Sequence, residues 1–137
     1  NSLGVKINYI TDGDVSGVIS VAVPNSNIDI YIGTGGAPEG VLAAAALSCL
    51  ECQMQTRLVF QDKKQKNKAI ELGINDLSKK YNIEDMVKDD VIFCATGITD
   101  GDLVKGIKDL GNSFQSETFV LHKSSKINKI IKNQTKK

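Results

Sequence analysis

The feature of this sequence that most restricts its fold is a glycine-rich loop that leads directly into an alanine-rich helix. Residues 33–40 read GTGGAPEG, and residues 39–50 contain mostly small apolar side chains. Glycine permits positive φ angles and close backbone approach, and Pro38 suits the first helical turn, where its missing N–H costs nothing. A helix with such small side chains can pack closely on a sheet. We therefore expect a strand–loop–helix unit, with residues 28–32 as the strand.

Strand and helix patterns alternate along the 137 residues. Segments with period-2 spacing of β-branched and aromatic residues indicate strands, and longer segments between them indicate helices. This order predicts an α/β layered domain with a mostly parallel or mixed central sheet, and since no Pro/Gly/Ser-rich linker divides the chain, we expect one domain. The predicted strands are residues 5–10, 28–32, 57–60, 91–96 (buried on both faces), 117–122 and 126–131, the last two antiparallel. The predicted helices are residues 15–23, 39–50, 63–73, 83–88 and 103–108.

Charge is unevenly distributed along the chain. Residues 123–137 carry six lysines and no acidic residue, which leaves 11 basic and 16 acidic residues in the rest of the chain. We expect this basic segment to be a solvated C-terminal tail, and the acidic body argues against a nucleic-acid partner. The longest apolar run, residues 41–47, is far shorter than the roughly 20 residues of a membrane span, so we expect no membrane partner.

The cysteine pattern favours free thiols in a reducing compartment, and hence a cytoplasmic protein. The count is three, and the N-terminal residues do not resemble a signal peptide. Cys49 and Cys52 form a CxxC at the predicted end of a helix, whereas a redox CxxC favours a helix start and a zinc site needs four ligands. A structural role is therefore favoured for both. His122 is the only histidine, and no nucleophile has an evident pairing with it, so no Ser–His–Asp triad is predicted.

Three loops rich in glycine and aspartate follow predicted strands, at residues 11–14, 33–40 and 96–102. In open α/β sheets, ligands bind beyond the carboxyl ends of the strands. The glycine-rich loop lacks the Lys-Ser/Thr of a P-loop, and Pro38 breaks GxGxxG, so nucleotide binding is disfavoured. Glu39 either compensates the helix dipole or is a metal ligand, because a carboxylate beside a phosphate needs a cation between them.

Two nearly identical strings, ITDGDV at residues 10–15 and ITDGDL at residues 98–103, use the same junction chemistry twice. In the first string, Asp12 and Asp14 have two alternative roles. They either form turns and helix caps, or they belong to a site in which their carboxylates accept hydrogen bonds from sugar hydroxyls or bind Mg²⁺ or Mn²⁺. Asp100 and Asp102 in the second string have the same alternatives, of which the turn role is favoured because turns strongly select aspartate.

Three strings together resemble one enzyme family. ITDGDV (10–15), GGAPEGVLAAA (35–45) and ATGITDGDL (95–103) are similar, in this order, to the C-terminal part of class II fructose-1,6-bisphosphatases, some of which also hydrolyse sedoheptulose 1,7-bisphosphate. The resemblance implies a fold similar to the C-terminal domain of the lithium-sensitive sugar and inositol phosphatases. It also implies metal-dependent release of fructose 6-phosphate and phosphate in gluconeogenesis.

Site residues follow from the same resemblance. It implies that Asp12, Gly13, Asp14 and Gly36 bind the sugar bisphosphate, and that Glu39 binds the catalytic Mn²⁺ or Mg²⁺. Family members have an additional N-terminal half with most of the metal ligands, and nothing in this chain matches that half. The stretch after residue 110 also departs from the family pattern.

We therefore expect a fragment that supplies one wall of the active site and has no bisphosphatase activity alone. Without its N-terminal domain, such a fragment would expose an apolar face, so a homo-oligomer is expected. The alternative is a stand-alone sugar-phosphate-binding or interaction module without catalysis.

Overall fold

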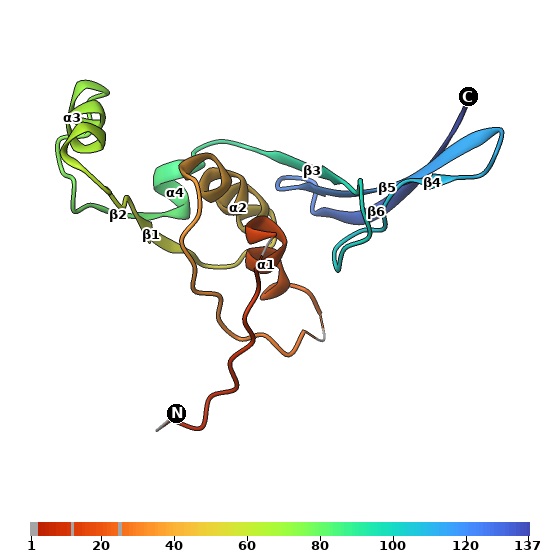
Figure 1. Cartoon of the computed structure of the whole chain (residues 1–137), viewed down its shortest axis with the longest axis horizontal. Helices are drawn as coiled ribbons and strands as arrows, with labels where there is room; N and C mark the ends of the chain where they lie inside the picture. The colour runs from red at the N-terminus through yellow and green to blue at the C-terminus, as the bar shows by residue number, and fades with distance from the viewer. Residues whose placement is uncertain (1–2, 12, 25) are drawn as a thin grey trace.

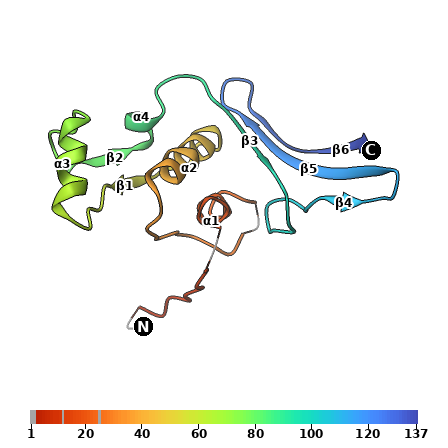
Figure 2. The ribbon, with the colours of Figure 1, turned by 45° about the horizontal axis from the view of Figure 1, so that its top comes forward.

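The computed structural model describes residues 3–11, 13–24 and 26–137. Two helices occupy the middle of the molecule, a four-stranded sheet lies to one side of them, and a small helical arm extends to the other (Figures 1 and 2). The helices are α1 (Asp14–Ser20), α2 (Ala37–Cys49), α3 (Lys63–Glu71) and α4 (Ile83–Met86). The strands are β1 (Gln55–Arg57), β2 (Lys80–Asn82), β3 (Ile92–Thr96), β4 (Lys108–Asp109), β5 (Ser113–His122) and β6 (Ile127–Lys136).

Strand β5 organises the larger sheet. Along one edge it pairs with β3, from Ile92↔His122 to Thr96↔Thr118, and then with the short strand β4. Along its other edge it pairs with β6 over its whole length. Every pairing among the described residues is antiparallel.

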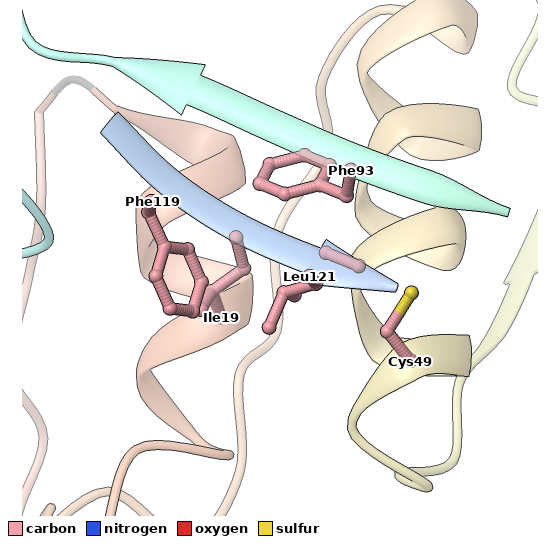
Figure 3. Packing of buried hydrophobic residues seen from close by; sticks show 6 residues of the cluster. Ile19, Cys49, Phe93, Phe119 and Leu121 are labelled. Carbon is pink, nitrogen blue, oxygen red and sulfur yellow. The ribbon is translucent and has the colours of Figure 1, made fainter. Parts of the chain in front are cut away.

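The core lies where α1 and α2 pack on one face of β3 and β5 (Figure 3). The rings of Phe93 and Phe119 meet edge to face with centroids 6.5 Å apart, a favourable aromatic geometry. Leu121 of β5 and Ile19 of α1 are both fully buried beside them. The cluster consists of Ile19, Ala46, Cys49, Phe93, Phe119 and Leu121.

Helix α2 is buried on two sides, which explains its small side chains. Ala46 and Cys49 face the sheet, while Ala44 and Leu47 form a second cluster with Ile83 of α4. Helix α2 begins at Ala37, two residues before its predicted start, and Pro38 lies in its first turn as the sequence predicts. Its position between two packed surfaces fixes where its N-terminus, and therefore Glu39, lies.

The arm consists of β1 and β2, paired antiparallel, with α3 between them in sequence. The side chain of Asp62 caps α3 by accepting a hydrogen bond from the backbone N–H of Gln65 at 2.7 Å. Gly73, which follows the helix, has φ of 88° and lets the chain turn away. The predicted polar helix at residues 63–73 is thus confirmed.

The predicted α/β class is confirmed, but several details of the sheet differ. Residues 5–10 and 28–32 form no strand, because no described segment pairs with them and an unpaired strand leaves its backbone groups without partners. The expected parallel pairing is therefore absent among the described residues, and the sheet is antiparallel. Residues 103–108 form a loop and the start of β4 instead of a helix.

Strand β3 is buried on one face, whereas the sequence predicts burial on both. Phe93 points into the core, while Ile92 on the opposite face is 64% exposed. The described helices that pack on the sheet, α1 and α2, cover the Phe93 face. An apolar run in the sequence does not by itself show whether other elements cover one face of the strand or both.

The basic C-terminal segment forms a strand where we expect a solvated tail. Residues 127–136 are β6, and the predicted antiparallel pairing with the preceding strand is confirmed. The side chains of its lysines remain at the surface, where Lys132 forms an ion pair with Glu117 at 3.1 Å. In the described part of the chain, no helix combines the length and apolarity needed to cross a membrane.

Replacement of Leu121 by alanine tests the core. Because Leu121 is fully buried between the sheet and both helices, Leu121→Ala should lower the free energy of unfolding by about 2–5 kcal/mol. Urea unfolding followed by circular dichroism measures the change. The matched control is Leu72→Ala, at a leucine that is 73% exposed after α3, where a change within about 0.5 kcal/mol is expected. Equal losses in both variants would contradict this position of the core.

Candidate functional site

A cleft of about 520 Å³ brings together three parts of the chain that the sequence marks as candidate loops. The N-terminal turn of α1 contributes Gly13 and Asp14, the first turn of α2 contributes Glu39, and the loop after β3 contributes Asp102. The lining residues are Thr11, Gly13, Asp14, Val15, Ser16, Glu39, Ala95, Thr99, Gly101, Asp102, Leu103 and Val104. Asp12 lies outside the described residues.

Glycines of the loop before α2 leave room for side chains of the site. A Cβ at Gly35 would lie 2.5 Å from Asp14 Oδ2, and one at Gly36 would overlap with the carboxylate of Glu39. A Cβ at Gly33 would likewise overlap with the phenol of Tyr31. Glycine at positions 33, 35 and 36 therefore leaves this space to the side chains of Tyr31, Asp14 and Glu39. The structure thus gives Gly36 a steric role beside Glu39.

Asp14 lies beside Gly35 of the glycine-rich loop and Tyr31 of the segment before it. It is the first residue of α1, and its carboxylate accepts a hydrogen bond from the phenol of Tyr31. Burial raises the pKa of the Tyr31 phenol, and the negative charge of Asp14 and the hydrogen bond raise it further. Tyr31 therefore stays protonated and ties the segment before the glycine loop to the start of α1. Sequence reasoning missed this contact because it treated residues 28–32 only as a strand.

Glu39 has the donor chemistry that a divalent cation requires, but the described residues do not form a complete cation site. Its exposed carboxylate lies in the first turn of α2 and faces the cleft. Oxygen ligands suit Mg²⁺ and Mn²⁺, which are commonly six-coordinate. Within residues 3–11, 13–24 and 26–137, no group of three or more Asp, Glu, His or Cys side chains could hold a metal ion. Glu39 could therefore supply one ligand of a site completed by other groups.

The loop after β3 is braced internally. Asp100 accepts a hydrogen bond from the backbone N–H of Gly106 at 2.9 Å, as the favoured turn interpretation predicts for this residue. The N–H of Ile107 donates to the carbonyl of Ile98 at 3.2 Å, and the N–H of Lys105 donates to Glu117 at 3.0 Å. The loop therefore presents Thr99 and Asp102 to the cleft from a defined backbone.

A polar cluster at the β5–β6 turn was not visible in the sequence. His122 lies between Ser125, with 2.6 Å from Nδ1 to Oγ, and Asp90, with 2.9 Å from Nε2 to Oδ2. Asp90 also accepts hydrogen bonds from the hydroxyl and the N–H of Ser124, at 2.7 and 3.0 Å. None of these residues lines the cleft. The cluster fastens the turn to the segment before β3, and its serine and histidine are engaged in that contact.

Cys49 is a core residue at the end of α2, which agrees with the structural interpretation of the CxxC. Its thiol is buried and lies 3.6 Å from the carbonyl oxygen of Val91. Burial raises the pKa of the Cys49 thiol, so this side chain stays neutral and poorly reactive.

Comparison with known proteins identifies the family. Residues 1–135 match the sequence model of the family described as bacterial fructose-1,6-bisphosphatase, glpX-encoded. The chain belongs to this family. The glpX-type fructose-1,6-bisphosphatase match includes all three loops of the cleft.

Curated relatives agree with the glpX-type assignment. A fructose-1,6-bisphosphatase class 2 from Haemophilus influenzae is 41% identical over 145 residues, which covers 95% of this chain and 43% of that protein. Proteins from two Synechococcus strains, each named D-fructose 1,6-bisphosphatase class 2/sedoheptulose 1,7-bisphosphatase, are 35% identical over 136 residues, which covers 90% of this chain and 39% of theirs. The chain thus spans about two fifths of the length of these relatives.

The Asp90 cluster generates a prediction about acid stability. Hydrogen bonds from Ser124, together with those from His122 and Val91, lower the pKa of Asp90 to about 2. A carboxyl whose pKa is lower when folded stabilises the fold above its ordinary pKa, and this contribution is lost as the pH falls through its folded pKa. The stability advantage of the unsubstituted chain over Asp90→Asn should therefore be constant above about pH 5 and shrink between about pH 4 and pH 2.

Thermal unfolding of both chains across this pH range measures the difference. Asp89→Asn, at the exposed neighbouring residue, is the control. An advantage over Asp90→Asn that is the same at pH 2 and pH 6 would contradict the proposed role of the Asp90 carboxylate.

Proposed function

We propose that this chain forms the C-terminal wall of a class 2 fructose-1,6-bisphosphatase. The complete enzyme would hydrolyse fructose 1,6-bisphosphate to fructose 6-phosphate and phosphate, a reaction of gluconeogenesis. The observation that carries the proposal is the cleft, because it is lined by the same loops in which the chain resembles the family. The names of the relatives from Haemophilus influenzae and Synechococcus support the substrate class.

The first TDGD turn and the glycine loop would hold the sugar bisphosphate. We propose Asp12, Gly13, Asp14 and Gly36 as its ligands. The carboxylate of Asp14 can accept hydrogen bonds from sugar hydroxyls, and its position beside Gly35 and Tyr31 supports this role. The lack of a side chain at Gly36 lets the backbone approach a ligand closely.

Glu39 would be the metal ligand that this chain supplies, for Mn²⁺ or Mg²⁺. Its exposed carboxylate at the cleft and its place in the GGAPEG string support the proposal. Such a cation, when bound, polarises a phosphoryl oxygen and lowers the pKa of bound water. Helix α2, packed between the sheet and α4, would hold Glu39 at a fixed place relative to Asp14.

The missing portion of the family's chain is the proposed partner. Residues 5–10 and 28–32 have strand-like patterns but lie unpaired, with Tyr9 89% exposed and Ile32 91% exposed. Ile10 and Tyr31 both approach Gly17 of α1, so the two segments converge on the same helix. Apolar segments of this kind are expected to be covered in the complete protein. We propose that they become strands against the N-terminal half.

Two further properties follow from the same reasoning. The three cysteines are free, which supports a cytoplasmic location. In the absence of the N-terminal half, the exposed apolar segments favour self-association into a homo-oligomer. A module that binds a sugar phosphate without catalysis is the alternative, and an activity measurement separates it from an enzyme.

Phosphate release from fructose 1,6-bisphosphate with Mn²⁺ tests the proposed activity. The chain alone should be inactive, whereas the chain combined with the N-terminal portion of the Haemophilus influenzae relative should release phosphate. Glu39→Ala in this combination should lower the rate by at least about 100-fold, because it removes a metal ligand. Glu71→Ala, at the exposed end of α3, is the matched control and should leave the rate unchanged.

Each result bears on a different part of the proposal. Turnover by the chain alone would contradict the incomplete site, and full activity of Glu39→Ala would contradict the metal role. Binding of fructose 6-phosphate without turnover by the combination would favour the non-catalytic module.

Hydrogen exchange tests the proposed partner. When the N-terminal portion is added, backbone amides of residues 5–10 and 28–32 should become protected, because strand pairing gives them hydrogen-bond acceptors. Mass spectrometry of peptides from these segments measures the effect. Peptides of α3, which lies in the peripheral arm, serve as the internal control, and protection confined to α3 would contradict the proposal.

A further inference from the structure

The second TDGD string faces the same cleft as the first, although the proposed function assigns a role only to the first. Of the first string, Thr11, Gly13, Asp14 and Val15 line the cleft. The corresponding residues of the second string, Thr99, Gly101, Asp102 and Leu103, line it as well. Two copies of one short sequence, 88 residues apart, thus contribute equivalent positions to one cavity.

The two aspartates of the second string differ in their contacts. Asp100 is used within the loop, where it accepts a hydrogen bond from Gly106. Asp102 is exposed to the cleft and, within the described part of the chain, no hydrogen bond or ion pair engages its carboxylate. The hydrogen bonds that brace the loop come from its backbone, from Asp100 and from Glu117, so within the described residues Asp102 takes no part in a turn or cap contact.

The two sides of this loop lie close together at two glycines. A Cβ at Gly106 would lie 2.6 Å from the carbonyl carbon of Thr99, and one at Gly97 would overlap with the carbonyl oxygen of Lys105. The two sides of the loop therefore lie in direct backbone contact. A carboxylate on such a support is positioned before a ligand arrives, which favours binding.

The chemistry of a carboxylate limits the ligand to a cation or a hydrogen-bond donor. An unshielded carboxylate repels a phosphate, and Asp102 does not join Asp14 and Glu39 in a group able to hold a metal among the described residues. Sugar hydroxyls are the donors that a fructose phosphate presents. We propose that Asp102, together with the hydroxyl of Thr99, binds hydroxyl groups of the sugar. This inference rests on the proposed function.

The test uses the active combination of this chain with the N-terminal portion of the Haemophilus influenzae relative. Asp102→Ala should raise both KM for fructose 1,6-bisphosphate and the inhibition constant of fructose 6-phosphate about tenfold, because a charge-assisted hydrogen bond is lost. Inhibition by inorganic phosphate and the affinity for Mn²⁺, measured by calorimetry, should stay unchanged. Asp109→Ala, in β4 and outside the cleft, is the matched control. Asp102→Asn keeps a hydrogen-bonding side chain and Thr99→Ala removes only a neutral hydroxyl, so both should raise KM and the fructose 6-phosphate inhibition constant by less than tenfold. These two variants replace Asp102→Ala in the test if that variant does not fold.

The outcomes separate this inference from the function on which it rests. If the unsubstituted combination neither binds nor hydrolyses the sugar phosphate, the proposed function fails and the inference fails with it. If the combination is active and Asp102→Ala leaves KM and the fructose 6-phosphate constant unchanged, only the inference fails. A loss of Mn²⁺ affinity would make Asp102 a cation ligand, and an equal weakening of inorganic phosphate would indicate general damage to the cleft. Either result overturns the assignment to sugar hydroxyls.

Discussion

The packing of α2 between the sheet and α4 is the interaction on which the rest of the structure depends. Ala46 and Cys49 contact the Phe93–Phe119–Leu121 surface, and Ala44 and Leu47 contact Ile83. Small side chains allow close approach on both sides, where a larger residue would be overpacked. Because this contact also sets the position of the helix N-terminus, the core of the molecule determines where Glu39 lies in the cleft that it shares with the turn of α1.

A second constraint acts at the cleft, where glycine residues lie directly beside carboxylate groups. Gly35 faces Asp14, Gly36 faces Glu39, and the loop after β3 closes on itself at Gly97 and Gly106. Glycine at positions 35 and 36 leaves room for these two carboxylates, and the phenol of Tyr31 donates a hydrogen bond to Asp14. The cleft thus carries the carboxylates of Asp14, Glu39 and Asp102, whose oxygens can accept hydrogen bonds or bind cations.

Much of the fold could be predicted from local patterns. The helix after the glycine loop, the capped helix α3 and the antiparallel pair β5–β6 lie close to their predicted positions because their signals are local. The patterns of residues 5–10 and 28–32 predict strands, but a strand forms only when another segment pairs with it. No described segment pairs with either of them. The cluster of Asp90, His122 and Ser125 escaped prediction because 32 residues separate Asp90 from His122, and sequence spacing carries no sign of their contact.

The sequence by itself determined the chemistry of the site: a glycine-rich loop before an alanine-rich helix, one glutamate in its first turn, and two TDGD strings. These features are properties of residue type and short spacing, and they sufficed for the family resemblance. Only the tertiary structure decided that Tyr31 contacts Asp14, that Asp100 braces its own loop while Asp102 faces the cleft, and that both TDGD strings line one cavity. The physical reason is that these relations depend on how α1, α2 and the β3 loop pack around a shared core, which is a property of the whole chain and of no single segment.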